Sequence, residues 1–146
     1  MNDRPPPHDC ELENAYLSCI LLEPEIVRSD VKPDDFYSRT NRLIYEVMLR
    51  LIGKGIKPDY ITIKSEFEKN GDLEVIDGGK YISMLTTFIP STANIEYYVH
   101  GIIDNSKRRS MLRISSTIAN NAFDSTSDLH EVLKEAIGEL TALGTV

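Results

Sequence analysis

Two glycine–lysine pairs are the places in this sequence where phosphate chemistry would be expected. A Walker loop needs a glycine five residues before its Gly-Lys pair and a serine or threonine directly after it. Gly79-Lys80 has Glu74 at the first of these positions and Tyr81 at the second. Gly53-Lys54 fails at both positions. We therefore expect that the chain itself neither binds nor hydrolyses a nucleotide.

Metal binding and acid–base catalysis are not indicated either. His8, His100 and His130 are far apart and lack the i, i+4 or His/Cys grouping of a zinc site, so we interpret them as solvated or hydrogen-bonded residues. Asp34 and Asp35 adjoin a proline turn, where helix capping explains them. The sequence predicts no catalytic residue, no metal site and no cofactor in this chain.

The sequence has one basic cluster, Lys107–Arg109 with Arg113. One interpretation is a solvated helix face balanced by Asp104. The other is a contact with an acidic partner or a phosphate backbone. Proteins that bind single strands stack bases on aromatic side chains, and this cluster has none. The net charge of −7 also disfavours a helix-turn-helix DNA binder, because it repels phosphates at long range.

The composition is that of an ordinary globular protein, with 41% hydrophobic and 27% charged residues. No apolar run reaches the ~18 residues of a membrane span, and the proline-rich N-terminus does not resemble a secretory signal. Cys10 and Cys19 are predicted on one helix, about 13.5 Å apart, which exceeds the ~7 Å that a disulfide allows. Two free thiols indicate a reducing environment, and we expect a cytoplasmic protein.

Hydrophobic periodicity and turn residues predict an all-α fold. Asp9 is a suitable cap for a helix that begins at Cys10. The β-branched triplet Ile61–Ile63 could alternatively form a strand, but no partner strand with turn signals lies nearby. Further helices are predicted at residues 39–52, at 58–70 and between Gly79 and Pro90.

Two longer helices follow, one from Asn94 to about Phe123 and one after Asp128, and antiparallel packing would make them an αα-hairpin. The polar stretch 104–110 predicts a kink or an exposed middle in the first of them. In the second, apolar residues at steps of 4, 3, 4 and 3 form a two-heptad seam, Leu129, Leu133, Ala136, Leu140 and Leu143. A seam this long also suits a second chain. We expect dimerisation through Met111, Ile114, Leu129, Leu133, Ala136 and Leu140.

The expected organisation is one domain with three parts. Residues 1–8 form a flexible arm, residues 9–93 a compact orthogonal helical bundle, and residues 94–146 the antiparallel hairpin.

Ten short pieces of the sequence stand in a recognisable order and register. They are Pro6-Pro7, Glu11–Glu13, Asp35–Tyr37, Leu43–Tyr45, Gly55–Asp59, Thr62, Gly71–Leu73, Gly78–Ile82, Pro90–Tyr98 and Arg109. Together they resemble the N-terminal domain of DnaB-type replicative DNA helicases over nearly the whole chain. Four positions depart from the usual residues of that family: Ser18, Asn41, Asp77 and Gly101.

The resemblance implies that hairpins of neighbouring subunits pair and that three such dimers form a ring collar above six motor domains. It also implies recruitment of a DnaG-type primase and, in some lineages, of a helicase loader. ATP, Mg²⁺ and DNA would be bound by the motor domain, which this sequence lacks. Tyr81, Leu112 and Ile118 occupy positions that match partner-facing places in the family. From the residues themselves, Tyr81 is better explained as the anchor of its helix.

Two functions remain open from the sequence. The first is the collar domain of an ATP-dependent 5′-3′ replicative helicase, which takes part in assembly and docking. The second is a separate phage or plasmid regulator that mimics the collar and modulates a host helicase. A reading frame that continues into a Walker loop would support the first, and a stop codon after Val146 would support the second.

Overall fold

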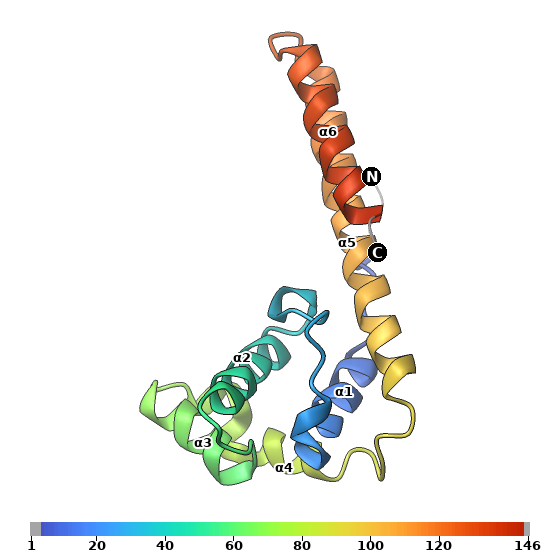
Figure 1. The fold of residues 1–146 in the computed structure, drawn as a ribbon. Helices are drawn as coiled ribbons and strands as arrows, with labels where there is room; N and C mark the ends of the chain where they lie inside the picture. Colours follow the sequence, from blue (N-terminus) through green and yellow to red (C-terminus); the bar gives the residue numbers. More distant parts are fainter. Residues whose placement is uncertain (1–3, 145–146) are drawn as a thin grey trace. The chain divides into compact units, whose positions relative to one another are not determined.

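The computed structural model describes residues 4–144, and within them the chain forms helices and no strand. This confirms the predicted all-α class. The helices are α1 (Cys10–Leu22), α2 (Arg39–Gly53), α3 (Tyr60–Lys69), α4 (Lys80–Thr86), α5 (Ile95–Phe123) and α6 (Leu129–Gly144) (Figure 1). Short 3-10 segments lie at Pro24–Ile26, Pro33–Asp35 and Leu73–Gly79.

The chain divides into two compact units. The core unit is His8–Ile103, which holds α1 to α4 and the first residues of α5. The hairpin unit comprises the described residues of Met1–Pro7 and Asp104–Val146, and therefore the rest of α5 together with α6. Residues 1–3 of the predicted arm and the last two residues of the predicted hairpin lie outside the described part.

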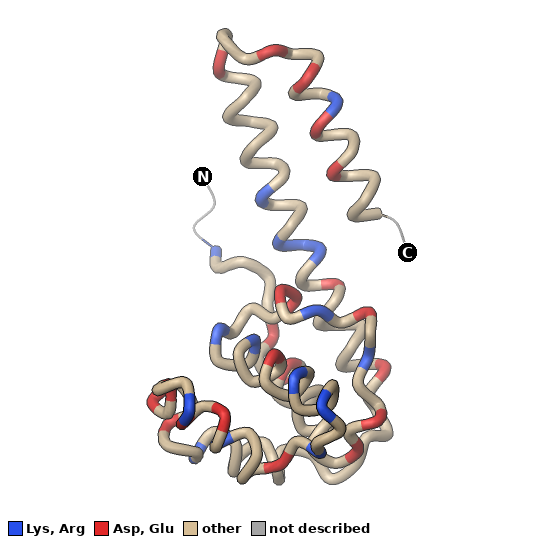
Figure 2. Tube along the Cα trace, turned by 60° about the vertical axis from the view of Figure 1, so that its left-hand side comes forward, with Lys and Arg blue, Asp and Glu red and all other residues tan. Residues whose placement is uncertain are grey.

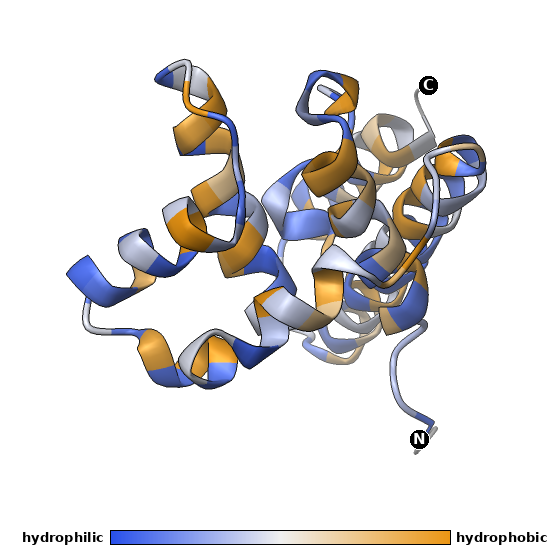
Figure 3. Ribbon diagram, turned by 90° about the horizontal axis from the view of Figure 1, so that it is seen from below, coloured by the Kyte–Doolittle hydropathy of each residue, from blue (hydrophilic) through white to orange (hydrophobic). Residues whose placement is uncertain are grey.

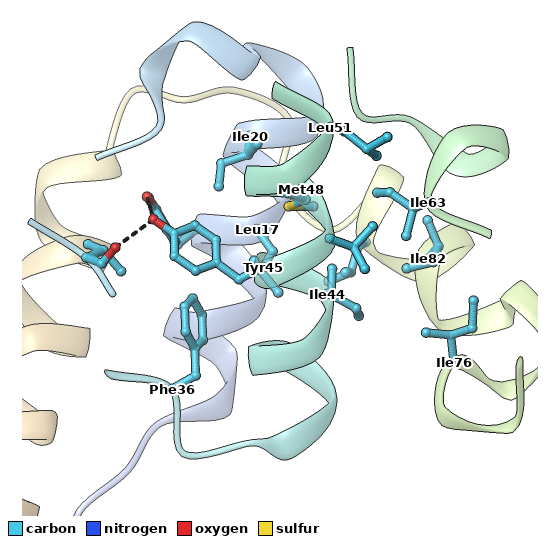
Figure 4. Close-up of a cluster of buried hydrophobic side chains, with 14 of the residues drawn as sticks. Leu17, Ile20, Phe36, Ile44, Tyr45, Met48, Leu51, Ile63, Ile76 and Ile82 are labelled. Atoms are coloured by element: carbon cyan, nitrogen blue, oxygen red, sulfur yellow. Dashed lines mark hydrogen bonds between the residues drawn. The ribbon is translucent and has the colours of Figure 1, made fainter. Parts of the chain in front are cut away.

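The hydrophobic centre of the core unit lies among α1, α2, α3 and α4, with α1 packed against both α2 and α4. Figure 3 shows apolar and polar residues alternating along the helices. In α1 the six residues from Ala15 to Ile20 are all buried, so this helix is enclosed on most of its sides. Fully or almost fully buried members include Tyr16, Leu17, Ile20, Phe36, Ile44, Tyr45, Met48, Leu51, Ile63, Ile76, Ile82 and Leu85 (Figure 4). A core of this size explains how helices that are too short to be stable alone persist here.

Buried tyrosines close this core on the side of the 28–31 segment (Figure 4). Tyr45 donates its hydroxyl to the carbonyl of Val31 at 2.8 Å, and the hydroxyls of Tyr16 and Tyr45 lie 3.1 Å apart. The Tyr16 hydroxyl in turn accepts the backbone N–H of Arg28 at 3.0 Å. Burial raises the pKa of both phenols, so they stay neutral and fix a loop that has no helix of its own.

Side-chain caps set where the helices begin. The Asp9 carboxylate accepts the N–H groups of Glu11 and Leu12, which confirms the predicted start of α1. Asp59 and Thr62 cap α3 reciprocally, and the Thr62 N–H lowers the pKa of Asp59. This cap explains why Ile61–Ile63 lies in a helix, although its β-branched residues could also have formed a strand.

The course of α5 and the end of α4 can be compared with the sequence prediction. The polar stretch 104–110 stays helical within α5, and Arg108 pairs there with Asp104 at 2.8 Å across one turn. α4 ends at Thr86, so Phe88 lies outside the helix, before Pro90. The start of α6 follows the prediction, because Asp128 accepts the N–H of Glu131 at 3.3 Å.

Candidate protein-interaction surfaces

The hairpin is held together by one side of α6. Ile114 of α5 is only 2% exposed. Ile114 and Ile118 line a narrow crevice with Val132 and Ala136 of α6, and both of these α6 residues are half-buried. Arg113 and Glu139 add an ion pair of 3.2 Å between the two helices. Two of the residues predicted for dimerisation, Ile114 and Ala136, therefore lie inside the hairpin.

The other apolar side of α6 has no covering element among the described residues of its unit. Leu129, Leu133, Ile137 and Leu140 are 67%, 52%, 64% and 43% exposed. Their spacing of four, four and three residues keeps them on one helical face, and we call this set the outer stripe. Monomeric proteins rarely expose a row of large apolar side chains of this length. Such a row is typical of a protein–protein interface.

Met111 of α5 extends the apolar surface near the base of the hairpin. Its side chain is half-exposed and lines a shallow groove with Leu140 and Leu143 of α6. Of the residues predicted for dimerisation, the structure thus brings Met111 and Leu140 together and leaves Leu129 and Leu133 on the same open face. The role of these residues in dimerisation stays a prediction.

Charges on the hairpin are unevenly distributed along its length (Figure 2). The base carries the basic cluster Lys107–Arg109 and Arg113, whereas the loop and the first turns of α6 carry Asp124, Asp128, Glu131 and Glu135. In the loop, the Thr126 hydroxyl lowers the pKa of Asp124, which stays ionised. The hairpin is therefore basic at its base and acidic at its tip. Asp104 balances Arg108, as the first interpretation of the cluster expected.

Tyr81 lies in the core unit, at the start of α4, and its side chain is half-buried. Its hydroxyl donates toward the side-chain oxygens of Asn14 and Asn41, at 2.9 and 2.7 Å. Burial is the main cause that raises the pKa of Tyr81. These bonds tie α4 to α1 and α2, which agrees with the interpretation of Tyr81 as an anchor. Its contact with a partner stays a prediction.

The carboxylate at the centre of this network is Glu13, which is 2% exposed. It accepts the backbone N–H of Tyr37 at 2.7 Å and that of Ser38 at 3.2 Å. The amide group of Asn41 donates to the same carboxylate at 3.1 Å. All three donors are neutral, so the buried charge is stabilised by hydrogen bonds alone. The sequence placed Glu13 in the first turn of this helix and in one of the ten matching pieces, but it did not predict that the carboxylate would be buried and bonded to the 37–38 backbone.

The segment before α4 is a left-handed turn. Asp77, Gly78 and Gly79 have φ values of 51°, 67° and 115°. At Gly79 a Cβ atom would lie 2.7 Å from the hydroxyl oxygen of Tyr60, so α3 approaches the backbone closely there. A non-glycine residue such as Asp77 adopts this conformation at some cost, but aspartate tolerates it better than most residues. The turn fixes where α4 begins and therefore the position of Tyr81 in its first turn.

Ser18 and Gly101 make close contacts that the apolar patterns did not reveal. Ser18 is buried in α1 and donates its hydroxyl to the carbonyl of Leu85 at 2.7 Å, near the end of α4. A Cβ atom on Gly101 would clash with Cδ1 of Leu12, so glycine allows α5 to approach α1. Each residue therefore serves packing between helices.

The remaining predicted partner residues lie in the hairpin unit. Leu112 is 51% exposed. Ile118 is half-buried and faces the crevice between α5 and α6. Leu112 and Ile118 therefore lie on different sides of α5, and the structure does not bring them together.

No catalytic arrangement is found in residues 4–144. No group of three His, Cys, Asp or Glu side chains in this part could hold a metal ion. Cys19 is fully buried, and burial raises its pKa to about 11, so it is a poor nucleophile. None of the described helices is both long and apolar enough to cross a membrane.

Comparisons with known proteins agree with this description. Residues 5–104 match the model of the DnaB-like helicase N terminal domain family. The replicative DNA helicase DnaC of Bacillus subtilis is 35% identical over 139 residues, which are 93% of this chain and 31% of that protein. The replicative DNA helicase DnaB of Rhodothermus marinus is 32% identical over 98% of this chain and 15% of that protein. The chain thus spans about a third of the length of these relatives, or less.

Solved structures share the fold. The N-terminal domain of the DnaB helicase from Mycobacterium tuberculosis superposes with a TM-score of 0.86 at 26% identity, covering 94% of this chain and 99% of that one. A DnaB-like replicative helicase, studied with its interactions with primase, superposes with a TM-score of 0.75 at 24% identity over 92% of this chain and 31% of that one. The matching family model, the relatives and the shared fold together show that this chain belongs to the DnaB-like helicase N-terminal domain family.

Proposed function

We propose that this chain is the assembly and docking domain of a hexameric replicative DNA helicase and acts in DNA replication in the cytoplasm. In this proposal the ATP- and Mg²⁺-dependent 5′-3′ unwinding, and the contact with DNA, belong to the part of the helicase beyond these residues. The chain contributes the pairing of subunits through its hairpin, predicted at 94–146, and a platform for other replication proteins. Family membership and the open apolar face of the hairpin support it.

The observation that carries the proposal is the outer stripe of α6, Leu129, Leu133, Ile137 and Leu140. Full burial of a large apolar side chain contributes about 1.5–3 kcal/mol, and these four are roughly half exposed. A two-fold dimer would cover the stripe of both copies, so burial would contribute about 8 kcal/mol. Association costs an estimated 4–15 kcal/mol. We therefore expect weak pairing of the isolated chain and firm pairing within a ring.

The charge distribution favours one arrangement of the two hairpins. An antiparallel pair places the acidic tip of one copy, with Glu131 and Glu135, beside the basic base of the other, with Lys107 and Arg113. A parallel pair would bring like charges together at both ends. Opposite charges at an interface fix its register more than its strength, so the antiparallel dimer is the arrangement we propose.

We further propose that a DnaG-type primase, and in some lineages a helicase loader, docks on this domain through Leu112, Ile118 and the region of Tyr81. Leu112 is the most accessible of the three. Tyr81 would act mainly by fixing α4, because its hydroxyl is already engaged by Asn14 and Asn41. The solved helicase studied with primase supports docking by analogy of fold.

Sedimentation equilibrium of the chain over a range of concentrations tests the pairing. We expect a monomer–dimer equilibrium, weakened at least tenfold by Leu133→Glu because a charge would be buried in the interface. The matched control is Ile61→Glu, which introduces the same charge at a side chain that is 72% exposed in the core unit. A wild-type chain that stays monomeric at several hundred micromolar, or equal weakening by both variants, would contradict the proposal.

A further inference from the structure

A second surface of the hairpin unit lies between the N-terminal arm and α5, and of the residues predicted for dimerisation it includes Met111 alone. It is a groove of about 330 Å³, which we call the arm groove. Its lining residues are Arg4, Pro5 and Pro7 of the arm and Arg108, Met111 and Leu112 of α5.

The wall that the arm contributes is held in place. Arg109 donates from its guanidinium to the carbonyl of Pro7 at 2.8 Å. The run Pro5–Pro7 fixes three successive φ angles, so this wall loses little conformational entropy when a ligand binds. The arm groove is therefore preorganised although one of its sides is not helical.

Leu112 of the arm groove faces away from α6, whereas Arg108 and Met111 also border the groove at Leu140 and Leu143. Successive residues of an α-helix are about 100° apart, so Leu112 points roughly 200° around α5 from Ile114, which is buried against α6. Leu112 is half-exposed with the arm in place. The outer stripe lies on α6, so a ligand in the arm groove would leave it uncovered.

The residues that line the arm groove are either apolar or positively charged. Met111, Leu112 and the prolines provide an apolar floor, while Arg4 and Arg108 provide positive charge, and none of the six lining residues is acidic. Arg108 uses its Nε–H on Asp104, and a guanidinium has five N–H donors in all. The groove can therefore take an apolar group and carboxylates at the same time.

We propose that the arm groove binds an acidic segment of a partner protein, with one bulky apolar side chain on Met111 and Leu112 and flanking carboxylates on Arg4 and Arg108. The argument is charge complementarity: the chain carries −7 overall, yet the charged residues that line this groove are the two arginines Arg4 and Arg108. A nucleic acid fits less well, because single-strand binding uses aromatic stacking and the lining contains no aromatic residue.

The experiment uses the whole chain and a short synthetic peptide, Glu-Glu-Leu-Trp-Leu-Glu-Glu. The chain contains no tryptophan, so the peptide's fluorescence reports binding without interference. A second peptide with every glutamate replaced by glutamine keeps the apolar part and removes the charge. We expect the acidic peptide to bind in the micromolar to millimolar range, more weakly as salt is added, and at least fivefold more tightly than the neutral one.

Variants locate the binding. Arg108→Gln and Leu112→Ser should weaken it about three- to tenfold, and so should Arg109→Gln, which releases the arm. The matched controls are Lys107→Gln and Ile137→Ser, which make the same kinds of change at side chains outside the arm groove; they should alter binding less than twofold. Thermal unfolding of each variant verifies that it is folded.

Several outcomes would overturn the proposal. The first is that the neutral peptide binds as tightly as the acidic one, or that the acidic peptide does not bind up to millimolar concentration. The second is that Lys107→Gln weakens peptide binding as much as Arg108→Gln does, or that Ile137→Ser weakens it. A labelled single-stranded oligonucleotide that binds more tightly and displaces the peptide would also overturn it, because the cations would then serve phosphates. The inference shares Leu112 with the proposed docking of a primase, but the peptide experiment requires neither a primase nor dimerisation. A failure of peptide binding would therefore leave the proposed function standing.

Discussion

Replacing Glu13 by glutamine should strongly destabilise the core unit, although the two side chains have nearly the same shape. One carboxylate oxygen of Glu13 accepts the N–H of Tyr37 at 2.7 Å, and the other accepts from Ser38 and Asn41 at 3.2 and 3.1 Å. Glutamine has a single oxygen, so its amino group must face a donor on one side. The least costly choice keeps the oxygen toward Ser38 and Asn41 and leaves the Tyr37 N–H without an acceptor.

The magnitude follows from these three bonds. An unsatisfied buried donor costs about 1–3 kcal/mol, and exchanging a charged acceptor for a neutral one weakens each remaining bond by roughly 1 kcal/mol. Flipping the Asn41 amide does not help, since its oxygen accepts from Tyr81 at 2.7 Å and its amino group donates to Asn14 at 3.0 Å. We expect Glu13→Gln to lower the free energy of unfolding by about 3 kcal/mol, and the melting temperature by about 10 °C.

Urea unfolding followed by circular dichroism measures this loss. The matched control is Glu68→Gln, the same chemical change on the exposed end of α3, which should stay within about 0.5 kcal/mol of the wild type. A Glu13→Gln variant as stable as this control would refute the reasoning. It would mean that the 37–38 backbone finds its acceptors elsewhere.

Two further predictions concern packing and pH. Gly101→Ala should be neutral or destabilising in the wild type, because its Cβ would displace Leu12. In a Leu12→Ala background the same substitution should stabilise the protein by about 1 kcal/mol through helix propensity. If urea unfolding shows the same effect in both backgrounds, this explanation is wrong. Burial raises the pKa of Cys19 from 9.0 to about 11, so the unfolded thiol ionises first and stability should fall between pH 9 and 11. Over that range the wild type should lose more stability than Cys19→Ala, by at most about 1.4 kcal/mol per pH unit; parallel losses would argue against it.

The sequence predicts most of this fold because local signals and burial agree. Asp9 caps α1 where an apolar stripe begins, and the glycines at the ends of α2 and α3 mark their stops. Ile61–Ile63 shows the limit of propensity, because the reciprocal cap of Asp59 and Thr62 decides for a helix. The end of α4 was less predictable, since Pro90 excludes a helix beyond it but does not say how far before it the helix stops.

Three of the four departures from the family pattern show what one-dimensional patterns leave out. Ser18 bonds to a carbonyl of the 80–86 helix, Asn41 links Glu13 to Tyr81, and Gly101 leaves room for Leu12. Each of these contacts joins residues at least 27 positions apart. Their partners depend on which helices lie side by side, which spacing along a single helix does not encode.

The same limit explains why the interaction surface was only partly predictable. The heptad pattern of α6 marks an apolar seam but gives equal weight to Ala136 and Leu133, although the first lies toward α5 and the second is 52% exposed. A helix with apolar residues over a wide arc can pack on α5 in more than one rotation. The ion pair between Arg113 and Glu139 and the burial of Ile114 select the rotation that places the smaller side chains, Val132 and Ala136, inside. The large side chains of the outer stripe then remain exposed, and this is the surface through which we propose that a second subunit binds.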